Sequence, residues 1–232
     1  MIHKKHMDPW KERFSVRVFC DEQPDYTEEI NYLIEMLSYV PIQNGVNSHF
    51  WMLLTPNDQD FKNWMFEKIC WTNRGTADDI THFLSIKKAP YTFLAVTHNP
   101  FSIPIGENFR NIGFHGGVIL TEAIRLGMDT APIGCFTGYY DNPKIKKEFT
   151  KRVNQFAGES LKKYVGPPTD FAGKQTNQKI KLWEPMFYIS LGKGERHTTN
   201  KSFESLLEYN GNQWQYTVGP KKGKPWNNVV KR

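Results

Sequence analysis

The chain has 232 residues and a formal net charge of +6, and 39% of its residues are hydrophobic. This length suits one sizeable domain of the α/β or α+β kind with a packed core, and the ordinary share of charged residues excludes wholesale disorder. The excess of basic over acidic residues favours anionic partners such as phosphate-bearing cofactors. No apolar run reaches membrane-spanning length, so we expect no membrane partner.

The cysteines give an expectation about the cellular compartment. There are three, Cys20, Cys70 and Cys135, so they cannot all pair within the chain. No C-x-x-C motif occurs either. A reduced, cytoplasmic protein therefore fits better than a disulfide scaffold.

Helical patterns alternate with apolar runs along the chain. The first predicted helix begins near Thr27, a favourable N-cap residue, and ends at Pro41. Its apolar face consists of Ile30, Leu33, Ile34 and Leu37. Further helical patterns cover residues 59–72, 77–87, 108–126 and 143–164.

Short apolar or extended runs predict the strands, which cover residues 50–54, 91–97, 131–136 and 186–191. Residues 98–108 and 165–182 are polar and predict loops, the second of them long enough to be a lid. Residues 208–232 form a tail that is either an arm lying on a partner subunit or a frayed terminus.

The helix over residues 108–126 is unusual in its glycines. Gly127 is well suited to end it. Gly113, Gly116 and Gly117 inside it lower helix propensity, which makes sense if another backbone or a flat ring packs very close.

The N-terminal run Arg13-Phe14-Ser15-Val16-Arg17 alternates polar and apolar side chains. In an extended segment two guanidinium groups and a hydroxyl would share one side. Arginine is suited to bidentate contacts with phosphate or carbonyl groups, and serine adds a hydrogen bond. On spacing alone, an edge strand with a polar face explains the run better than a binding site does.

Taken in order, several motifs resemble those of the nitroreductase family. The Arg-x-Ser-x-Arg run precedes an amphipathic helix, and the loop after Pro41 carries Asn44 and Asn47. The glycine-bearing helix then leads to Ala131-Pro132-Ile133-Gly134-Cys135-Phe136. The resemblance spans residues 10–207. Each motif is weak by itself, whereas their order and context are moderately specific.

The resemblance implies an α+β fold in a single nitroreductase-like domain over residues 1–232. The core at 10–207 would be a three-layer α/β/α sandwich with a mixed, mostly antiparallel central sheet and a long central helix at the dimer interface. Residues 165–182 would be an inserted loop and residues 208–232 a C-terminal arm.

The resemblance also implies an FMN site. Arg13 and Ser15 would hold the phosphate and ribityl chain, Arg17 would lie near N1 and O2, and a backbone N–H of the segment around Gly134 and Cys135 would donate to N5. Either Arg196 or Lys201 would reach the phosphate. The implied cofactor-binding set is Arg13, Phe14, Ser15, Arg17, Asn44, Asn47, Pro132, Ile133, Gly134, Cys135, Arg196 and Lys201. No metal site is expected.

The implied activity is that of an FMN-dependent oxidoreductase. NADH or NADPH would reduce the flavin, and a nitroaromatic, quinone or similar electron-poor small molecule would reoxidise it by ping-pong hydride transfer. The implied assembly is a homodimer with the flavin at the subunit interface.

Two alternatives remain open at this point. One is a flavoprotein of the same fold with other chemistry, such as dehalogenation or flavin breakdown. The other is a basic nucleic-acid-binding protein, which is less favoured because the aromatic residues lie in apolar runs and no recognised binding module is present.

Overall fold

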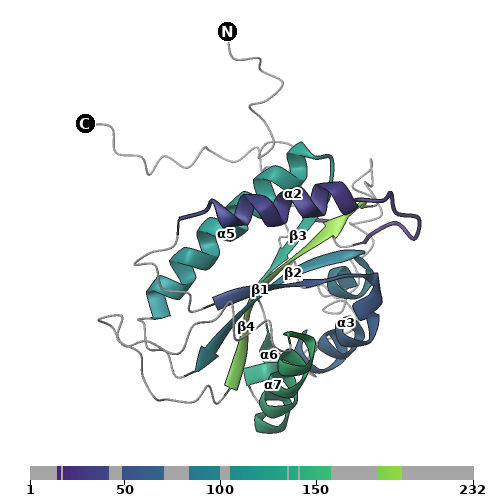
Figure 1. The fold of residues 1–232 in the computed structure, drawn as a ribbon. Coiled ribbons are helices and arrows are strands. Elements are labelled where there is room, and N and C mark those ends of the chain that lie inside the picture. The colour runs from purple at the N-terminus through teal and green to yellow at the C-terminus, as the bar shows by residue number, and fades with distance from the viewer. Residues whose placement is uncertain are drawn as a thin grey trace, which may run out of the picture.

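A computed structural model describes residues 15–16, 18–41, 49–70, 84–99, 105–134, 136–140, 142–157 and 182–194, apart from the side chains of 98, 99, 105–109 and 137. Its centre is a four-stranded sheet in the order β1-β2-β4-β3. The strands are β1 (His49–Leu54), β2 (Tyr91–Asn99), β3 (Asp129–Ile133) and β4 (Leu182–Gly192). Helices lie on both sides of this sheet (Figure 1).

All three ladders of the sheet are antiparallel. A parallel bridge between Ser15 and Thr130 adds the N-terminal segment beside β3, so the arrangement is mixed but mostly antiparallel. The central strands β2 and β4 have side chains buried on both faces, which explains why their sequences are long apolar runs.

One face of the sheet is covered by α2 (Thr27–Ser38) and α5 (Ile105–Arg125), which lie side by side in Figure 1. Ile30 and Leu33 of α2 and Ile119 and Ala123 of α5 are buried in one apolar cluster. The strands contribute Phe93, Ile189 and Leu191 to the same cluster. This packing fixes the long helix α5 over the sheet.

The other face is covered by α3 (Gln59–Met65), η4 (Phe66–Cys70), α6 (Thr137–Tyr140) and α7 (Pro143–Ala157). A short 3-10 turn, η3 (Pro56–Asp58), precedes α3 and is held by a capping box between Thr55 and Asp58. The second core contains Met52, Leu54, Leu94, Val96 and Tyr188 of the strands with Met65, Phe149 and Val153 of the helices. The protein is therefore a three-layer α/β/α sandwich, which confirms the predicted fold class.

The start of α2 differs from the prediction. Thr27 is the first helical residue rather than the N-cap, which is Tyr26 without a side-chain cap. The backbone N–H and the hydroxyl of Thr27 donate to Asp25 Oδ1, at 3.0 and 2.6 Å. The prediction that Ile34 belongs to the apolar face is also wrong, because its side chain is 45% exposed.

The end of α5 was predicted correctly and has a clear physical cause. Gly127 has a φ of +82°, and its N–H donates to the carbonyl of Ile124 while that of Met128 donates to Ala123. These two bonds form a Schellman motif, in which glycine is favoured because its left-handed backbone carries no Cβ penalty. The helix begins at Ile105, within the stretch that the sequence predicted as a loop.

The remaining boundaries follow the predicted patterns, with shifts. The predicted helix over 59–72 is α-helical to Met65 and π-helical to Cys70, and the short strand predicted over 131–136 is β3, which ends at Ile133. Residues 84–88 are helical, so the helix predicted over 77–87 ends one residue later than expected, and its residues 77–83 lie outside the described residues. Leu182, assigned to the predicted loop, is the first residue of β4. The rest of that loop, residues 158–164 and the C-terminal arm lie outside the described residues.

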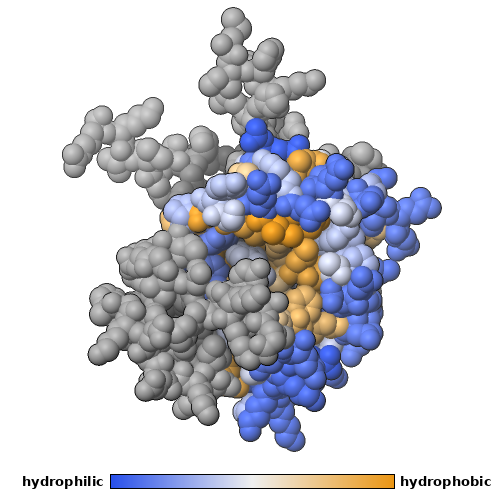
Figure 2. Space-filling model, in the orientation of Figure 1, coloured by the Kyte–Doolittle hydropathy of each residue, from blue (hydrophilic) through white to orange (hydrophobic). Residues whose placement is uncertain are grey.

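Figure 2 shows an apolar band on one face of the molecule, below α2 and above the hydrophilic surface at the bottom of the view. Strand β1 crosses this face in Figure 1, and among the described residues it pairs on one side only, with β2. Its half-buried side chains Phe50, Trp51 and Leu53 are apolar. Within the described ranges, no helix has both the length and the apolar character needed to cross a membrane.

Candidate functional site

The N-terminal segment runs along the edge of the sheet and ends beside the C-terminal end of β4. Ser15 bridges Thr130 in the parallel sense, and the N–H of Val16 donates to the Thr130 carbonyl at 2.9 Å. Phe19 then bridges Gly194 in the antiparallel sense. Ser15 therefore lies beside β3, the strand that leads directly to residues 132–134.

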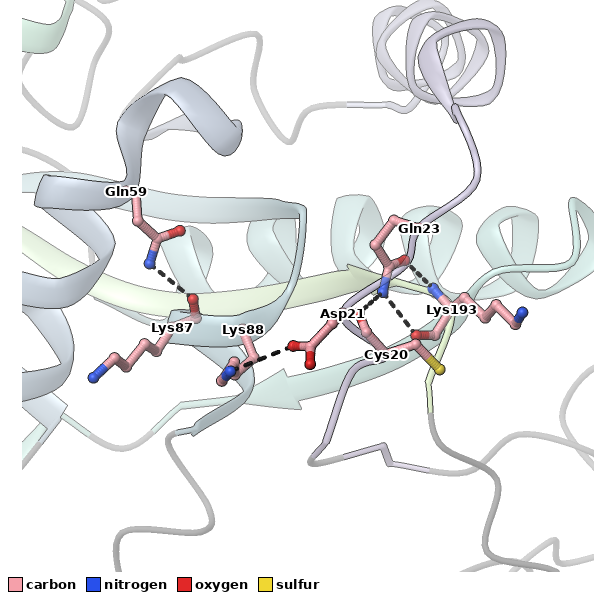
Figure 3. A network of polar contacts seen from close by, with 7 residues as sticks. All are labelled: Cys20, Asp21, Gln23, Gln59, Lys87, Lys88 and Lys193. Atoms are coloured by element: carbon pink, nitrogen blue, oxygen red, sulfur yellow. Dashed lines mark hydrogen bonds and ion pairs between the residues drawn. The ribbon is translucent and has the colours of Figure 1, made fainter.

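Gln23 fastens this segment to the end of β4 (Figure 3). Its side-chain oxygen accepts from the Lys193 N–H at 2.6 Å, and its amide nitrogen donates to the Lys193 carbonyl at 3.0 Å. The same nitrogen donates to the carbonyl of Cys20, whose own N–H donates to Lys193 at 2.9 Å. One amide side chain thus satisfies backbone groups of both segments.

Glycines allow the two segments to approach closely. A Cβ added to Gly194 would collide with the side chain of Val16, and one added to Gly192 would lie 2.8 Å from Gln23 Oε1. Gly192 also has a φ of +156°, which side chains rarely tolerate. The N–H of Gly194 donates to buried Asp129 Oδ2 at 2.9 Å. Steric fit and hydrogen bonds therefore both determine how the N-terminal segment pairs with the end of β4.

The end of β3 presents backbone to the surface. Pro132 pairs with Ile189 and Ile133 with Tyr188, and Ile133 is buried in the second core. Gly134 follows and is exposed. Because it has no side chain, no Cβ covers the backbone of Gly134 at this exposed position.

Four of the predicted site residues lie within the described part of the chain, and the structure brings them to one edge of the sheet. They are Ser15, Pro132, Ile133 and Gly134. The others lie outside the described residues, and they are Arg13, Phe14, Arg17, Asn44, Asn47, Cys135, Arg196 and Lys201. The backbone links from Phe19 and Cys20 to Lys193 and Gly194 join the N-terminal segment to the end of β4.

A pair of buried histidines lies where β1 meets α5. The ring centroids of His49 and His115 are 5.2 Å apart in an edge-to-face arrangement. Burial, reinforced by the neighbouring His115, lowers the pKa of His49 to about 4, and burial also lowers the pKa of His115. Both rings are therefore neutral at pH 7. The sequence alone does not indicate this contact, because a lone histidine in an apolar pattern gives no signal that it will meet another.

Lys62 of α3 is the most deeply buried charged side chain described. It is 1% exposed, and its amine donates to the carbonyls of Ala89 at 2.8 Å and Pro90 at 3.4 Å. Burial lowers its pKa to about 8. Its partners are backbone groups of the two residues before β2, so it holds α3 against the sheet. Among the described residues no group of three or more His, Cys, Asp or Glu side chains could hold a metal ion.

No protein-family model matches the sequence, and no curated protein matches it either. Solved structures do match the fold. A nitroreductase family protein from Clostridium novyi NT is 14% identical with a TM-score of 0.54, over 88% of this chain and 90% of that one. An FMN-dependent nitroreductase from Clostridium difficile R20291 is also 14% identical with a TM-score of 0.54, over 90% and 99%.

A third solved structure carries a ligand. It is a candidate nitroreductase in complex with FMN from Desulfovibrio desulfuricans, 10% identical with a TM-score of 0.55, over 84% of this chain and 88% of that one. The structural similarity extends over most of this chain and most of each neighbour, so it covers most of the fold and is not confined to one motif. The chain has the nitroreductase fold, as the resemblance of its motifs implied.

Proposed function

We propose that this protein is an FMN-dependent oxidoreductase that takes electrons from NADH or NADPH and passes them to an electron-poor small molecule, such as a nitroaromatic or a quinone. The observation that carries the proposal is the edge of the sheet where Ser15 pairs with β3 and Gly134 exposes its backbone, in a chain with the nitroreductase fold. One structural neighbour is named FMN-dependent and another contains FMN.

The residues present fit an FMN site. Arg13 and Ser15 would bind the phosphate and ribityl chain, and Arg17 would place positive charge beside the pyrimidine ring, where it favours the anionic reduced form. The backbone around Gly134 and Cys135 would donate to N5. FMN, when bound, supplies the hydride chemistry, and the chain supplies binding, orientation and charge. Asn44, Asn47 and one of Arg196 and Lys201 would complete the site.

A homodimer built on α5 belongs to the same proposal. Phe114 on this helix is 55% exposed, and a Cβ added to Gly113 or Gly117 would meet no described atom within 4 Å. An exposed aromatic beside two glycines allows a second copy of the chain to approach closely. We also place the protein in the cytoplasm, consistent with Cys20, which forms no disulfide within the described part of the chain.

Flavin loading is the experiment that tests the proposal. The purified protein, after incubation with FMN, should be yellow, and NADH or NADPH should bleach its flavin absorbance until a quinone or nitroaromatic is added. Protein that takes up no FMN would overturn the proposal. Bound flavin that neither nucleotide bleaches would point instead to the same fold with different chemistry.

A pair of double variants tests the placement of the site. Arg13→Ala with Arg17→Ala should weaken FMN binding at least about tenfold, because each lost charged contact removes more than about 1 kcal/mol. The matched control is Lys144→Ala with Lys147→Ala, which removes two exposed charges from α7. Equal FMN affinity in both double variants would mean that the N-terminal run does not bind the phosphate.

A further inference from the structure

The ring of Phe187 in β4 lies between α5 and the turn that follows β3. A Cβ added to Gly116 would lie 3.3 Å from Phe187 Cε1, and one added to Gly134 would lie 3.7 Å from Phe187 Cδ2. These two atoms are at opposite corners of the ring. The ring therefore extends from the helix to the turn, with a glycine against each end.

A bulge in the sheet turns this part of β4 toward α5. Ala95 of β2 pairs with Phe187, whereas Val96 pairs with Pro185, so Met186 is an extra residue in β4. Met186 and Phe187 both pack in the small cluster that contains Ile112 of α5, although neighbouring residues of a regular strand point to opposite faces. Bulges re-aim side chains in this way and are common next to functional sites.

Surrounding side chains hold the ring in place. Trp51 of β1 packs against it edge to face, with centroids 6.4 Å apart and an interplanar angle of 80°. The ring is half-buried, and its own backbone belongs to a central strand paired on both sides. A ring fixed by a sheet, a helix and a second aromatic has few other positions available.

We propose that Phe187 is a positioning residue for the backbone at Gly134, and that Gly116 is a glycine because α5 must admit the end of this ring. This inference rests on the proposed FMN site, in which that backbone donates to N5. The ring sets the distance between α5 and Gly134, so it fixes where the backbone of Gly134 lies. A hydrogen-bond donor displaced by about 1 Å loses much of its contribution.

The chain offers a matched control for this role. Phe93 of β2 lies on the same face of the sheet and also packs edge to face against Trp51, with centroids 6.5 Å apart. It belongs to the cluster under α2 and α5, whereas the contacts with Gly116 and Gly134 are made by Phe187. Phe187→Leu and Phe93→Leu therefore remove similar rings, and only the first removes the support of the turn.

Three readouts separate positioning from general loss of packing. In Phe187→Leu, hydrogen exchange at residues 132–136 should become faster without any flavin, FMN should bind about tenfold more weakly, and the flavin midpoint potential should shift. In Phe93→Leu, exchange at 132–136 and the potential should stay as in the wild type. If the two variants behave alike while the wild type binds FMN, the positioning role is overturned and the proposed function survives. A wild type that binds no FMN overturns both.

A second pair of variants tests the glycine. Gly116→Ala should push the ring toward the turn and raise exchange at residues 132–136, because its Cβ has a ring atom only 3.3 Å away. Gly113→Ala on the same helix meets no described atom within 4 Å and should leave that exchange unchanged. Equal exchange in the two variants would show that the ring does not couple α5 to the turn.

Discussion

His49 of β1 and His115 of α5 pack edge to face with their ring centroids 5.2 Å apart, and both are buried. His115 Nδ1 lies 2.8 Å from the carbonyl oxygen of Asn111, so this nitrogen carries the proton and donates it. His49 Nδ1 is buried and has no hydrogen-bond partner in the described part of the chain. Protonating either ring would place a charge in an apolar contact between a strand and a helix.

The first prediction follows from this pair and concerns acid stability. The pKa of His49 is lowered from 6.5 to about 4 in the folded protein. Between these two pH values the unfolded chain binds more protons than the folded chain, so the free energy of unfolding falls as the pH is lowered. In the wild type it should fall by on the order of 2 kcal/mol more between pH 7 and 5 than in His49→Phe. Urea unfolding at each pH measures this difference.

The comparison with the variant removes the contribution of the carboxylates, which titrate in both proteins over the same range. His49→Phe keeps an aromatic ring against His115 and has no group to protonate. Parallel pH profiles for the two proteins would contradict the prediction, because they would show that His49 titrates alike in the folded and unfolded chains.

The second prediction concerns Lys62 and alkaline pH. Its pKa is lowered from 10.5 to about 8 in the folded protein, so the unfolded chain binds the extra proton between these values. The free energy of unfolding should therefore rise as the pH increases from 8 toward 10.5, by on the order of 2 kcal/mol up to pH 9.5. The neutral amine keeps its hydrogen bonds to Ala89 and Pro90 and no longer has a buried charge.

Lys62→Met tests whether Lys62 causes this rise in the free energy of unfolding at alkaline pH. The variant keeps the apolar stem and lacks the titrating amine, so its stability should not show the rise between pH 8 and 9.5. Lys147→Met, at an exposed position on α7, should retain the wild-type profile. If Lys62→Met and the wild type show the same rise, another group is responsible for it.

Much of the fold is visible in the sequence because its signals are local. The strands β1, β2 and β4 can be recognised from the apolar composition of their sequences alone. Gly127 ends α5 because glycine adopts a positive φ without strain. The errors have local causes too. Thr27 donates its N–H and its hydroxyl to Asp25, two residues before it, and lies inside the helix instead of accepting a hydrogen bond as its N-cap. Ile34 has the right spacing for the apolar stripe of α2 but lies beyond its edge, in solvent.

The candidate site was less predictable, because its contacts join distant parts of the chain. Gln23 and Lys193 are 170 residues apart, and Asp129 and Gly194 are 65 apart. No pattern around Gln23 indicates that it will bind a strand end, since an amide side chain in a polar stretch is common. The resemblance to a family supplied the association of Ser15 with residues 132–134, which composition and spacing did not.

The third prediction uses the Gln23 side chain, which joins the N-terminal segment to the end of β4. Gln23→Ala should lower the free energy of unfolding by about 1–3 kcal/mol, because backbone groups of Cys20 and Lys193 lose their partner. Hydrogen exchange should rise at residues 15–23 and 192–194. If the FMN site lies where we propose, FMN affinity should fall as well, since the segment that carries Ser15 becomes less fixed.

Gln59→Ala is the control for this effect. Gln59 also donates its side-chain amide to a backbone carbonyl, that of Lys87 at 2.9 Å, and is half-buried (Figure 3). It connects α3 to the residues before β2, on the other side of the network. Its loss should raise exchange near residues 84–88 and leave residues 15–23 and FMN binding unchanged. Faster exchange at residues 15–23 in both variants would mean that the N-terminal segment depends on overall stability rather than on Gln23.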